Sequence, residues 1–274
     1  MITGAAGGIG AAAAEELRWR SARVVGLDLR ADGEIVACDV REQASVDAAV
    51  AEATERLGGI DVLINNAGVG TPQRAGARPD DGALAVLDIN LVGPWRVAAA
   101  AMPALRESRG RVVNVASGLA FFAAPFAPAY CMSKRGLTAY SDSLRQELGD
   151  EITVTTVYPG YIRTPIHDAA AEQGLSLEGV VPAERLEDAA RALARAALGP
   201  PARDLATTRS GAVAYALARR LPQRALDRLS RTRFTGLASG DSFEGSALAA
   251  DFVDRARSRS HGRSRNRGRS RQRP

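Results

Sequence analysis

Short runs of β-branched and apolar residues alternate with longer alanine-rich stretches along most of the chain. Five of the runs are predicted strands: Arg23 to Asp28, Ile35 to Cys38, Asp61 to Asn65, Arg111 to Ala116 and Ile152 to Tyr158. The stretches between them are rich in Ala, Leu, Glu and Arg and are predicted helices: residues 10–19, 45–57, 91–108, 128–148 and 183–198. This alternation is typical of a doubly wound, Rossmann-type α/β domain, in which helices cover both faces of a parallel sheet.

The pattern weakens after about residue 200. A weak strand at 204–208 leads into an arginine-studded amphipathic stretch, Gly211 to Phe234, which we interpret as a cap or an oligomer surface. Residues 255–274 hold nine arginines, no acid and no apolar face, so we expect a solvated, disordered tail there. The sequence therefore predicts a main domain at 1–200, a helical extension at 201–254 and a tail at 255–274.

The first strand is truncated in this sequence. Only Met1 and Ile2 precede a glycine-rich turn that begins at Thr3. The first strand of a doubly wound sheet is central and normally needs about five residues. Either the true start lies upstream, or the domain folds around a very short strand.

Charge and cysteine content exclude several classes of protein. The net charge of +5 is due to the tail, because without its nine arginines the chain has 27 basic residues against 31 acids. Such a tail could bind nucleic acid or anionic lipid through counterion release, but no aromatic residues lie between its arginines, so we favour a tail without such a partner. No apolar run is long enough to span a membrane, and two cysteines with two histidines form neither a disulfide framework nor a metal site. We therefore expect a cytoplasmic protein without a metal.

One lysine, Lys134, is present in the chain among 35 arginines. It follows Tyr130 by four residues, and this spacing places both side chains on one face of the predicted helix. A compact ammonium with three rotatable donors can fit beside a bound sugar, where a planar guanidinium cannot. We interpret this helical face as catalytic.

A glycine-rich sequence, Thr3-Gly4-Ala5-Ala6-Gly7-Gly8-Ile9-Gly10, opens directly into the first predicted helix. Glycines there let the backbone approach a pyrophosphate at the helix N-terminus, where free N–H groups and the helix dipole favour anions. The next strand ends at Asp28, 18 residues after Gly10, close to the spacing expected of an acid that binds the adenosine ribose. The charge of Asp28 would repel a 2′-phosphate, so NAD is favoured over NADP; Arg30 keeps NADP as the alternative.

In this order the motifs resemble the short-chain dehydrogenase/reductase family, in its single-domain form, over positions 1 to about 200. The motifs are the turn at 3–10, Asp39-Val40, Asn65-Asn66-Ala67-Gly68, Asn90, Ser117, Tyr130-x3-Lys134 and Pro159-Gly160-x3-Thr164. The resemblance implies a dinucleotide-binding catalytic domain. It also suggests a homodimer or homotetramer built on the helices at 91–108 and 128–148.

The resemblance implies a catalytic tetrad of Asn90, Ser117, Tyr130 and Lys134. At pH 7 only about one free tyrosine in a thousand is a phenolate, and the charges of Lys134 and of an oxidised nicotinamide would stabilise that form. Tyr130 would then be the general base in alcohol oxidation and the general acid in carbonyl reduction. Ser117 would hold the substrate oxygen, and Asn90 would anchor a water that relays protons to Lys134.

Cofactor contacts follow from the same resemblance. Besides Tyr130 and Lys134, they would be Gly4, Gly8, Ile9, Gly10, Asp28, Asp39, Val40, Asn66, Ile162 and Thr164. Asp39 and Val40 would meet the adenine, Asn66 the ribose, and Ile162 and Thr164 the carboxamide and the phosphates. Asn66 would also suit an ordinary turn, and Asp39 an ordinary approach to a helix.

Apolar residues after Ser117 and after the Pro159-Gly160 turn suggest a hydrophobic secondary alcohol or ketone as substrate. They are Leu119, Phe121, Phe122, Pro125, Phe126, Tyr161 and Ile166, with His167 beside them. Ordinary core packing is the alternative for several of them. The competing function is a non-catalytic dinucleotide-binding sensor or scaffold, tethered to nucleic acid or membrane by the basic tail, because a fold does not dictate a function.

Overall fold

A seven-stranded parallel sheet forms the centre of the computed structural model, which describes residues 1–176, 178, 183–239, 243 and 245–258. The strand order is β3-β2-β1-β4-β5-β6-β7. The strands are β1 (Ile2–Thr3), β2 (Gly26–Asp28), β3 (Ile35–Ala37), β4 (Val62–Asn65), β5 (Arg111–Val115), β6 (Thr153–Tyr158) and β7 (Asp204–Ala206). The order reverses between β1 and β4, so the predicted doubly wound fold is confirmed.

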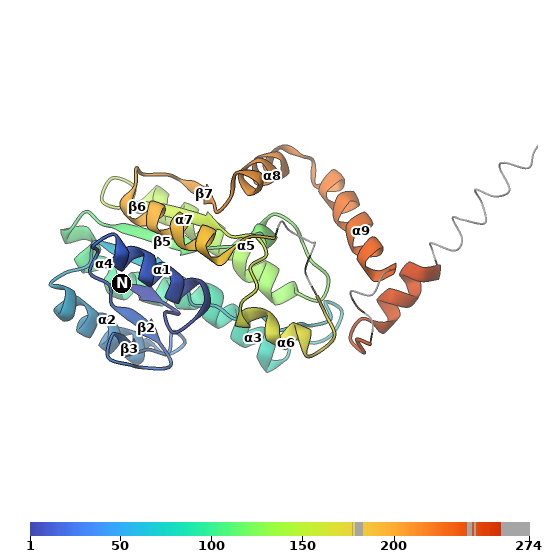
Figure 1. Ribbon diagram of the computed structural model, residues 1–274, viewed down its shortest axis with the longest axis horizontal. Helices are drawn as coiled ribbons and strands as arrows, with labels where there is room; N and C mark the ends of the chain where they lie inside the picture. Colours follow the sequence, from blue (N-terminus) through green and yellow to red (C-terminus); the bar gives the residue numbers. More distant parts are fainter. Residues whose placement is uncertain (177, 179–182, 240–242, 244, 259–274) are drawn as a thin grey trace, which may run out of the picture.

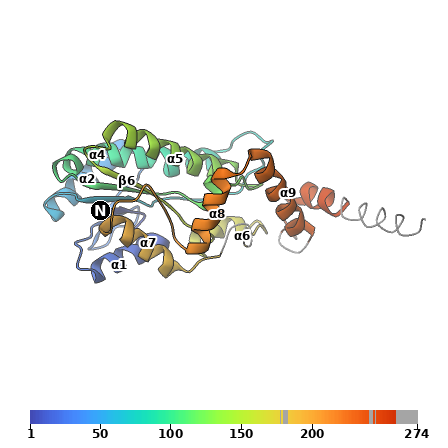
Figure 2. The same cartoon turned by 90° about the horizontal axis from the view of Figure 1, so that it is seen from above.

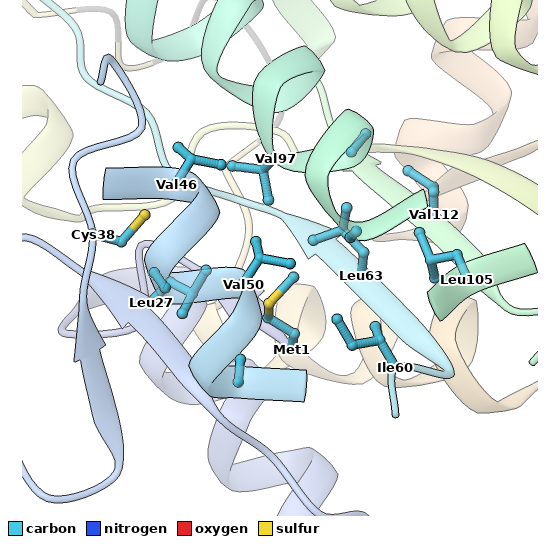
Figure 3. Packing of buried hydrophobic residues seen from close by; sticks show 14 of the residues in the cluster. Met1, Leu27, Cys38, Val46, Val50, Ile60, Leu63, Val97, Leu105 and Val112 are labelled. Carbon is cyan, nitrogen blue, oxygen red and sulfur yellow. The ribbon is translucent and has the colours of Figure 1, made fainter. Parts of the chain in front are cut away.

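Helices cover both faces of the sheet (Figure 1). In Figure 2, α1 (Gly8–Trp19) and α7 (Leu186–Leu198) lie below the sheet, and α2 (Gln43–Leu57), α4 (Gly93–Glu107) and α5 (Pro128–Leu148) lie above it. Each side has its own apolar core. Figure 3 shows the core under α2 and α4, where the valines of both helices meet side chains of three strands: Leu27, Leu63 and Val112. This packing fixes the strand ends that carry the site.

The two-residue strand β1 is central despite its length. Ile2 is fully buried and pairs with Gly26 on one side and Ile64 on the other. The hydroxyl of Thr3 accepts hydrogen bonds from the backbone N–H groups of Asn66 and Ala67, both at 3.0 Å. The sheet thus forms around a very short strand, and Thr3 joins it to the turn after β4.

The remaining elements are α3 (Asp81–Leu87), the π-helical turn η1 (Asp88–Val92), η2 (Gly118–Ala120), η3 (Pro165–His167), α6 (Asp168–Ala171), α8 (Arg209–Arg220) and α9 (Gln223–Ser239). Of these, α8 and α9 lie within the predicted helical extension, whereas the sequence analysis did not predict α3, η2, η3 and α6. A final helix spans residues 250–258. Residues 255–258, which we expected in the disordered tail, belong to this helix. The reason is that Ala249, Val253 and Ala256 form a buried apolar row. The rest of the expected tail, 259–274, lies outside the described residues.

Among the described residues, one segment, Asp81–Glu107, is long and apolar enough to cross a membrane by length and composition. In the fold it is α3, η1 and α4 in succession, so a π-helical turn interrupts it. Val97, Ala101 and Leu105 on α4 are fully buried in the core above the sheet. The segment is a layer of this domain, and core helices of globular proteins meet the same criterion.

Candidate active site

A cleft of about 290 Å³ opens at the carboxyl ends of the central strands, where the strand order reverses. Ligands of doubly wound proteins bind at this place in the fold. Ten of the predicted site residues line the cleft: Gly4, Gly8, Ile9, Asp28, Asn66, Ser117, Tyr130, Lys134, Ile162 and Thr164. The remaining four, Gly10, Asp39, Val40 and Asn90, do not line it. One compact surface therefore joins motifs spread over 160 residues of sequence.

The glycine-rich turn has the shape that a pyrophosphate requires. Gly4 and Gly8 have φ angles of +67° and +54°, and a Cβ on Gly7 would meet no atom within 4 Å. Gly7 precedes α1 and no side chain caps that helix, so its first N–H groups are available to an anion. A Cβ on Gly10 would lie 2.0 Å from the carbonyl oxygen of Gly4. Gly10 therefore permits close packing of the turn, whereas the other glycines face the cleft.

Asp28 ends β2 and lines the cleft at the carboxyl end of that strand. Its Oδ2 accepts a hydrogen bond from the backbone N–H of Ala6 at 3.0 Å, so the carboxylate is fixed against the glycine-rich turn. Arg30 lines the same end of the cleft and is exposed. It forms no ion pair with any carboxylate in the described part of the chain. Asp28, which would favour NAD, and Arg30, which would favour NADP, therefore lie close to each other.

Asp39 and Val40 follow β3 and are not among the residues that line the cleft. The carboxylate of Asp39 forms an ion pair with Arg41 at 2.6 Å, and the hydrogen bonds in this pair hold its pKa below the usual value. Val40 is buried in the core above the sheet, against the site where a Cβ on Gly93 would stand. The expected contact of both residues with the adenine therefore stays a prediction.

Tyr130, Lys134 and Ser117 lie together on one wall of the cleft. The first two stand four residues apart on α5, and Ser117 follows β5. The side chains of Ser117 and Tyr130 share a hydrogen bond. The ammonium of Lys134 lies 5.7 Å from the centre of the Tyr130 ring and donates a hydrogen bond to the carbonyl oxygen of Val115 at 2.9 Å. The predicted helical face is therefore formed, with the lysine buried behind the tyrosine.

Burial governs the acidities of this wall. It raises the pKa of Tyr130 to about 12, although the hydrogen bond with Ser117 acts in the opposite direction. It lowers the pKa of Lys134 to about 8. The phenolate that the sequence analysis expected is thus disfavoured in the protein alone, because desolvation of the phenol outweighs that hydrogen bond.

Asn90 lies behind the cleft in the π-helical turn η1 and is fully buried. Its side chain accepts from the N–H and donates to the carbonyl of Val69, both at 2.9 Å. A Cβ on Gly68 would lie 3.3 Å from Asn90 Oδ1 and 3.5 Å from Lys134 Nζ. Asn90 and Lys134 therefore border the same small space, which Gly68 leaves open. Such π-helical turns are frequent at functional sites.

Comparison with known proteins decides the family. A model of the short chain dehydrogenase family matches residues 1–174. The chain belongs to this family.

The 3-oxoacyl-acyl-carrier-protein reductase FabG of Vibrio cholerae is 30% identical over 203 residues, 69% of this chain and 83% of FabG. Retinol dehydrogenase 16 of Mus musculus is 35% identical over 187 residues, 62% of this chain and 58% of that protein. A short chain dehydrogenase from Burkholderia cenocepacia, solved in complex with NADP, has a TM-score of 0.67 and 28% identity, and the match covers 79% of this chain and 91% of that one.

The chain is thus a short-chain NAD(P)-dependent dehydrogenase/reductase that acts on CH–OH groups.

The residues between β6 and α8 support its site in a way that sequence reasoning missed. The carboxylate of Glu184 accepts hydrogen bonds from the N–H of Gly160 at 2.7 Å and from the hydroxyl of Thr208 at 2.8 Å, and also from Thr207. Glu184 joins the Pro159-Gly160 turn to the end of β7. No local signal could reveal this contact, because its partners lie 23 or 24 residues away on either side.

The substrate end of this short-chain dehydrogenase is lined by apolar side chains from distant parts of the chain. They are Leu119, Pro125, Phe126, Tyr161, Ile166, Leu175 and Phe243. Phe126 lies edge-on to Phe243, with ring centres 6.0 Å apart, and to Phe252 at 5.6 Å. Phe121 and Phe122 do not line this cleft, because Phe121 stacks on Tyr215 outside it. The sequence analysis did not predict that the C-terminal extension forms part of the wall.

Proposed function

We propose that the enzyme interconverts a hydrophobic secondary alcohol and the corresponding ketone, with NAD as its preferred cofactor. The carrying observation is that Ser117, Tyr130 and Lys134 share one wall of a cleft whose substrate end is apolar. Among the residues that the structure describes, no arginine lines that cleft beside Tyr130 to bind a carboxylate or phosphate of a substrate.

Each of the four tetrad residues has a role in this proposal. Bound nicotinamide supplies or accepts the hydride. Ser117 holds the substrate oxygen, and Tyr130 donates its hydroxyl proton to that oxygen in reduction and removes it in oxidation. The buried ammonium of Lys134 stabilises the phenolate that remains. Asn90 positions Val69 and Gly68, so that the space between Asn90 and Lys134 can hold a water that replaces the proton.

The cofactor part of the proposal rests on the glycine-rich turn and on Asp28. The turn, with Ile9, binds the pyrophosphate at the start of α1, and Thr164 lies beside Gly8, 3.6 Å from where its Cβ would stand. Asp28 binds the ribose hydroxyls and repels a 2′-phosphate. Asn66 lies near the ribose, Ile162 near the carboxamide, and Asp39 with Val40 at the adenine edge. Arg30 supports NADP as the second candidate.

We further propose that the enzyme is a cytoplasmic homodimer or homotetramer. On the outer faces of α4 and α5, Trp95 and Met132 are exposed, and Trp95 packs against Tyr140. Helical faces of this kind can pair between two copies of the chain. Cys38 and Cys131 are both free thiols, which suits a reducing compartment.

A substrate screen tests the proposal directly. Purified enzyme is supplied with secondary alcohols and NAD or NADP, and with the matching ketones and the reduced cofactors, and the absorbance of reduced nicotinamide is followed. Turnover of apolar substrates in preference to charged ones is expected. Cofactor binding without turnover of any substrate would favour the sensor or scaffold instead.

A further inference from the structure

Helix α8 is apolar on two opposite faces. Its inner row, Gly211, Tyr215 and Ala218, is buried against the body of the enzyme. Val213 and Leu217 lie two residues away from that row, about 200° around the helix, and are 61% and 56% exposed. Leu221 continues their row at the helix end and is also exposed. In the part of the chain that the structure describes, packing covers the first face only.

Helix α9 shows a basic outer face in the same part of the molecule. Its buried row is Leu226, Phe234 and Ala238, which leaves Arg224 and Arg228 on the opposite side. Residues 209–239 contain seven arginines and one acid, Asp227. Of these arginines, Arg219 is held by Asp204 at 3.0 Å. Five others form no ion pair with a carboxylate of the described residues: Arg209, Arg220, Arg224, Arg228 and Arg231.

We define the α8–α9 surface as Val213, Leu217, Leu221 and Leu229, with Arg209, Arg220, Arg224 and Arg228, all of which are exposed. Both views show the two helices following one another along the edge of the molecule, beyond the sheet (Figures 1 and 2). We propose that the α8–α9 surface docks the enzyme on an anionic lipid bilayer. Exposed leucine and valine can enter the region between headgroups and acyl chains, while arginines pair with lipid phosphates and carboxylates.

Other occupants fit this surface less well. A nucleic acid would leave four exposed aliphatic side chains uncovered, and the surface offers no exposed aromatic ring on which a base could stack, since Tyr215 and Phe234 are buried. A second copy that used the same surface symmetrically would bring arginines against arginines. An anionic bilayer satisfies both the charge and the apolar row.

The test is vesicle co-sedimentation of the full chain. Phosphatidylcholine vesicles with and without phosphatidylserine are compared for the wild type, for Val213→Ser with Leu217→Ser, and for Arg224→Gln with Arg228→Gln. Every sample keeps residues 259–274, so any contribution of the arginines there is common to all. We expect binding that requires phosphatidylserine and that falls about tenfold or more in each double variant.

Controls separate this surface from general stickiness and from charge alone. Leu84→Ser removes another exposed leucine, on α3, and should leave binding unchanged. The serine pair should retain wild-type retention on heparin, because it removes no charge, and wild-type turnover, which also reports that it folds. Unchanged vesicle binding of the serine pair would overturn the proposal. A serine pair that alters only the mass of the particle in light scattering would also overturn it, in favour of an interface between copies.

Discussion

The two ends of the cleft are built by different means. The cofactor end consists of short motifs placed directly after β1, β2 and β4, and glycines such as Gly4 and Gly8 present only backbone to the cleft there. The substrate end is made of side chains from 119 to 175 and from residue 243, held together by ring contacts. A backbone site needs particular residues in a fixed order. An apolar wall needs only volume, so its sequence can vary while its chemistry stays the same.

The two ends of the cleft are also anchored differently. At the cofactor end, Asn66 donates hydrogen bonds from its backbone N–H and its side-chain amide to the hydroxyl and the carbonyl oxygen of Thr3, which joins two adjacent strand ends. At the substrate end, Arg74 donates to the carbonyl oxygens of Leu248 at 3.0 Å and Ala247 at 2.9 Å, and so reaches across 173 or 174 residues of sequence. Changes at the first end should alter cofactor binding, and changes at the second should alter the choice of substrate. A change at Tyr130, where the two ends meet, should leave the binding of cofactor and of substrate unaltered and stop the reaction.

The largest effect is expected for Tyr130→Phe. It removes the oxygen that transfers the proton and keeps the ring, so kcat should fall by about a thousandfold, within the range that general acid–base catalysis contributes. NAD affinity, measured by calorimetry, should change by less than about twofold. This is well below the roughly tenfold change that corresponds in free energy to one pKa unit. Residual turnover above about a tenth of wild type would refute the role given to Tyr130.

Lys134→Arg should lower kcat by about a hundredfold, because a guanidinium is too broad for a site that exposes only 4% of the lysine. The pH profile adds a second readout. The pKa of Lys134 is lowered to about 8, so its ammonium is present below that pH and is lost as the pH rises through it. We therefore expect kcat/KM for carbonyl reduction to fall above about pH 8 in the wild type. That limb should be absent in the arginine variant, which stays charged. A fully active variant would contradict the argument from the lone lysine.

Much of the fold could be predicted from the sequence because its strands and helices carry their own periodicity. The helix at 128–148 has the predicted bounds, with Pro128 at its first turn. By contrast, α3 and η1 were not predicted, because the seven residues of α3 are too few to show a clear period. The apolar row at 249, 253 and 256 was missed because it crosses the start of the expected tail at Arg255, and the arginines from that position onward dominate the composition.

The site divides in the same way. Residues of the glycine-rich turn and of the tetrad could be predicted, since family motifs fix their order and spacing. Glu184 and Phe243 could not, because each acts through partners brought near only by the tertiary fold. The direction of the Tyr130 pKa shift also depends on burial, which no spacing reveals.

Asp28→Ala sharpens the cofactor side of the comparison. Loss of the carboxylate removes the ribose hydrogen bonds and the repulsion of a 2′-phosphate, so the preference for NAD over NADP should shrink by about tenfold. Titration of both cofactors against the purified variant measures the ratio. Arg30→Gln is the matched control and should not improve NAD binding. A wild type that already prefers NADP would show that Arg30, and not Asp28, sets the choice.

Phe243→Ala probes the opposite end. The side chain is 2% exposed and lines the cleft, so its removal should raise KM for bulky apolar substrates by about tenfold, the expected cost of deleting an aromatic ring from an apolar pocket. NAD affinity should stay at the wild-type value. Phe243→Leu, which keeps most of the apolar volume, should recover part of the loss. An equal change for the smallest and the bulkiest substrates would show that the residue stabilises the fold without selecting the substrate.

The smallest effect is expected from shortening the chain, and the position of the cut decides the outcome. Removal of residues 259–274 should leave kcat and KM within about twofold of wild type, because among the described residues the buried apolar cluster at the substrate end has its last member at Ala256. Removal from Arg255 takes Ala256 away and should raise KM for bulky substrates about threefold, since roughly one buried methyl group is removed. Both truncations remove most of the nine C-terminal arginines and should reduce retention on heparin at low salt. Steady-state kinetics on one small and one bulky substrate separate the two cuts. Equal kinetic loss in both would mean that residues 259–274 also contribute to the substrate end, and the boundary between the two regions would then lie later in the chain.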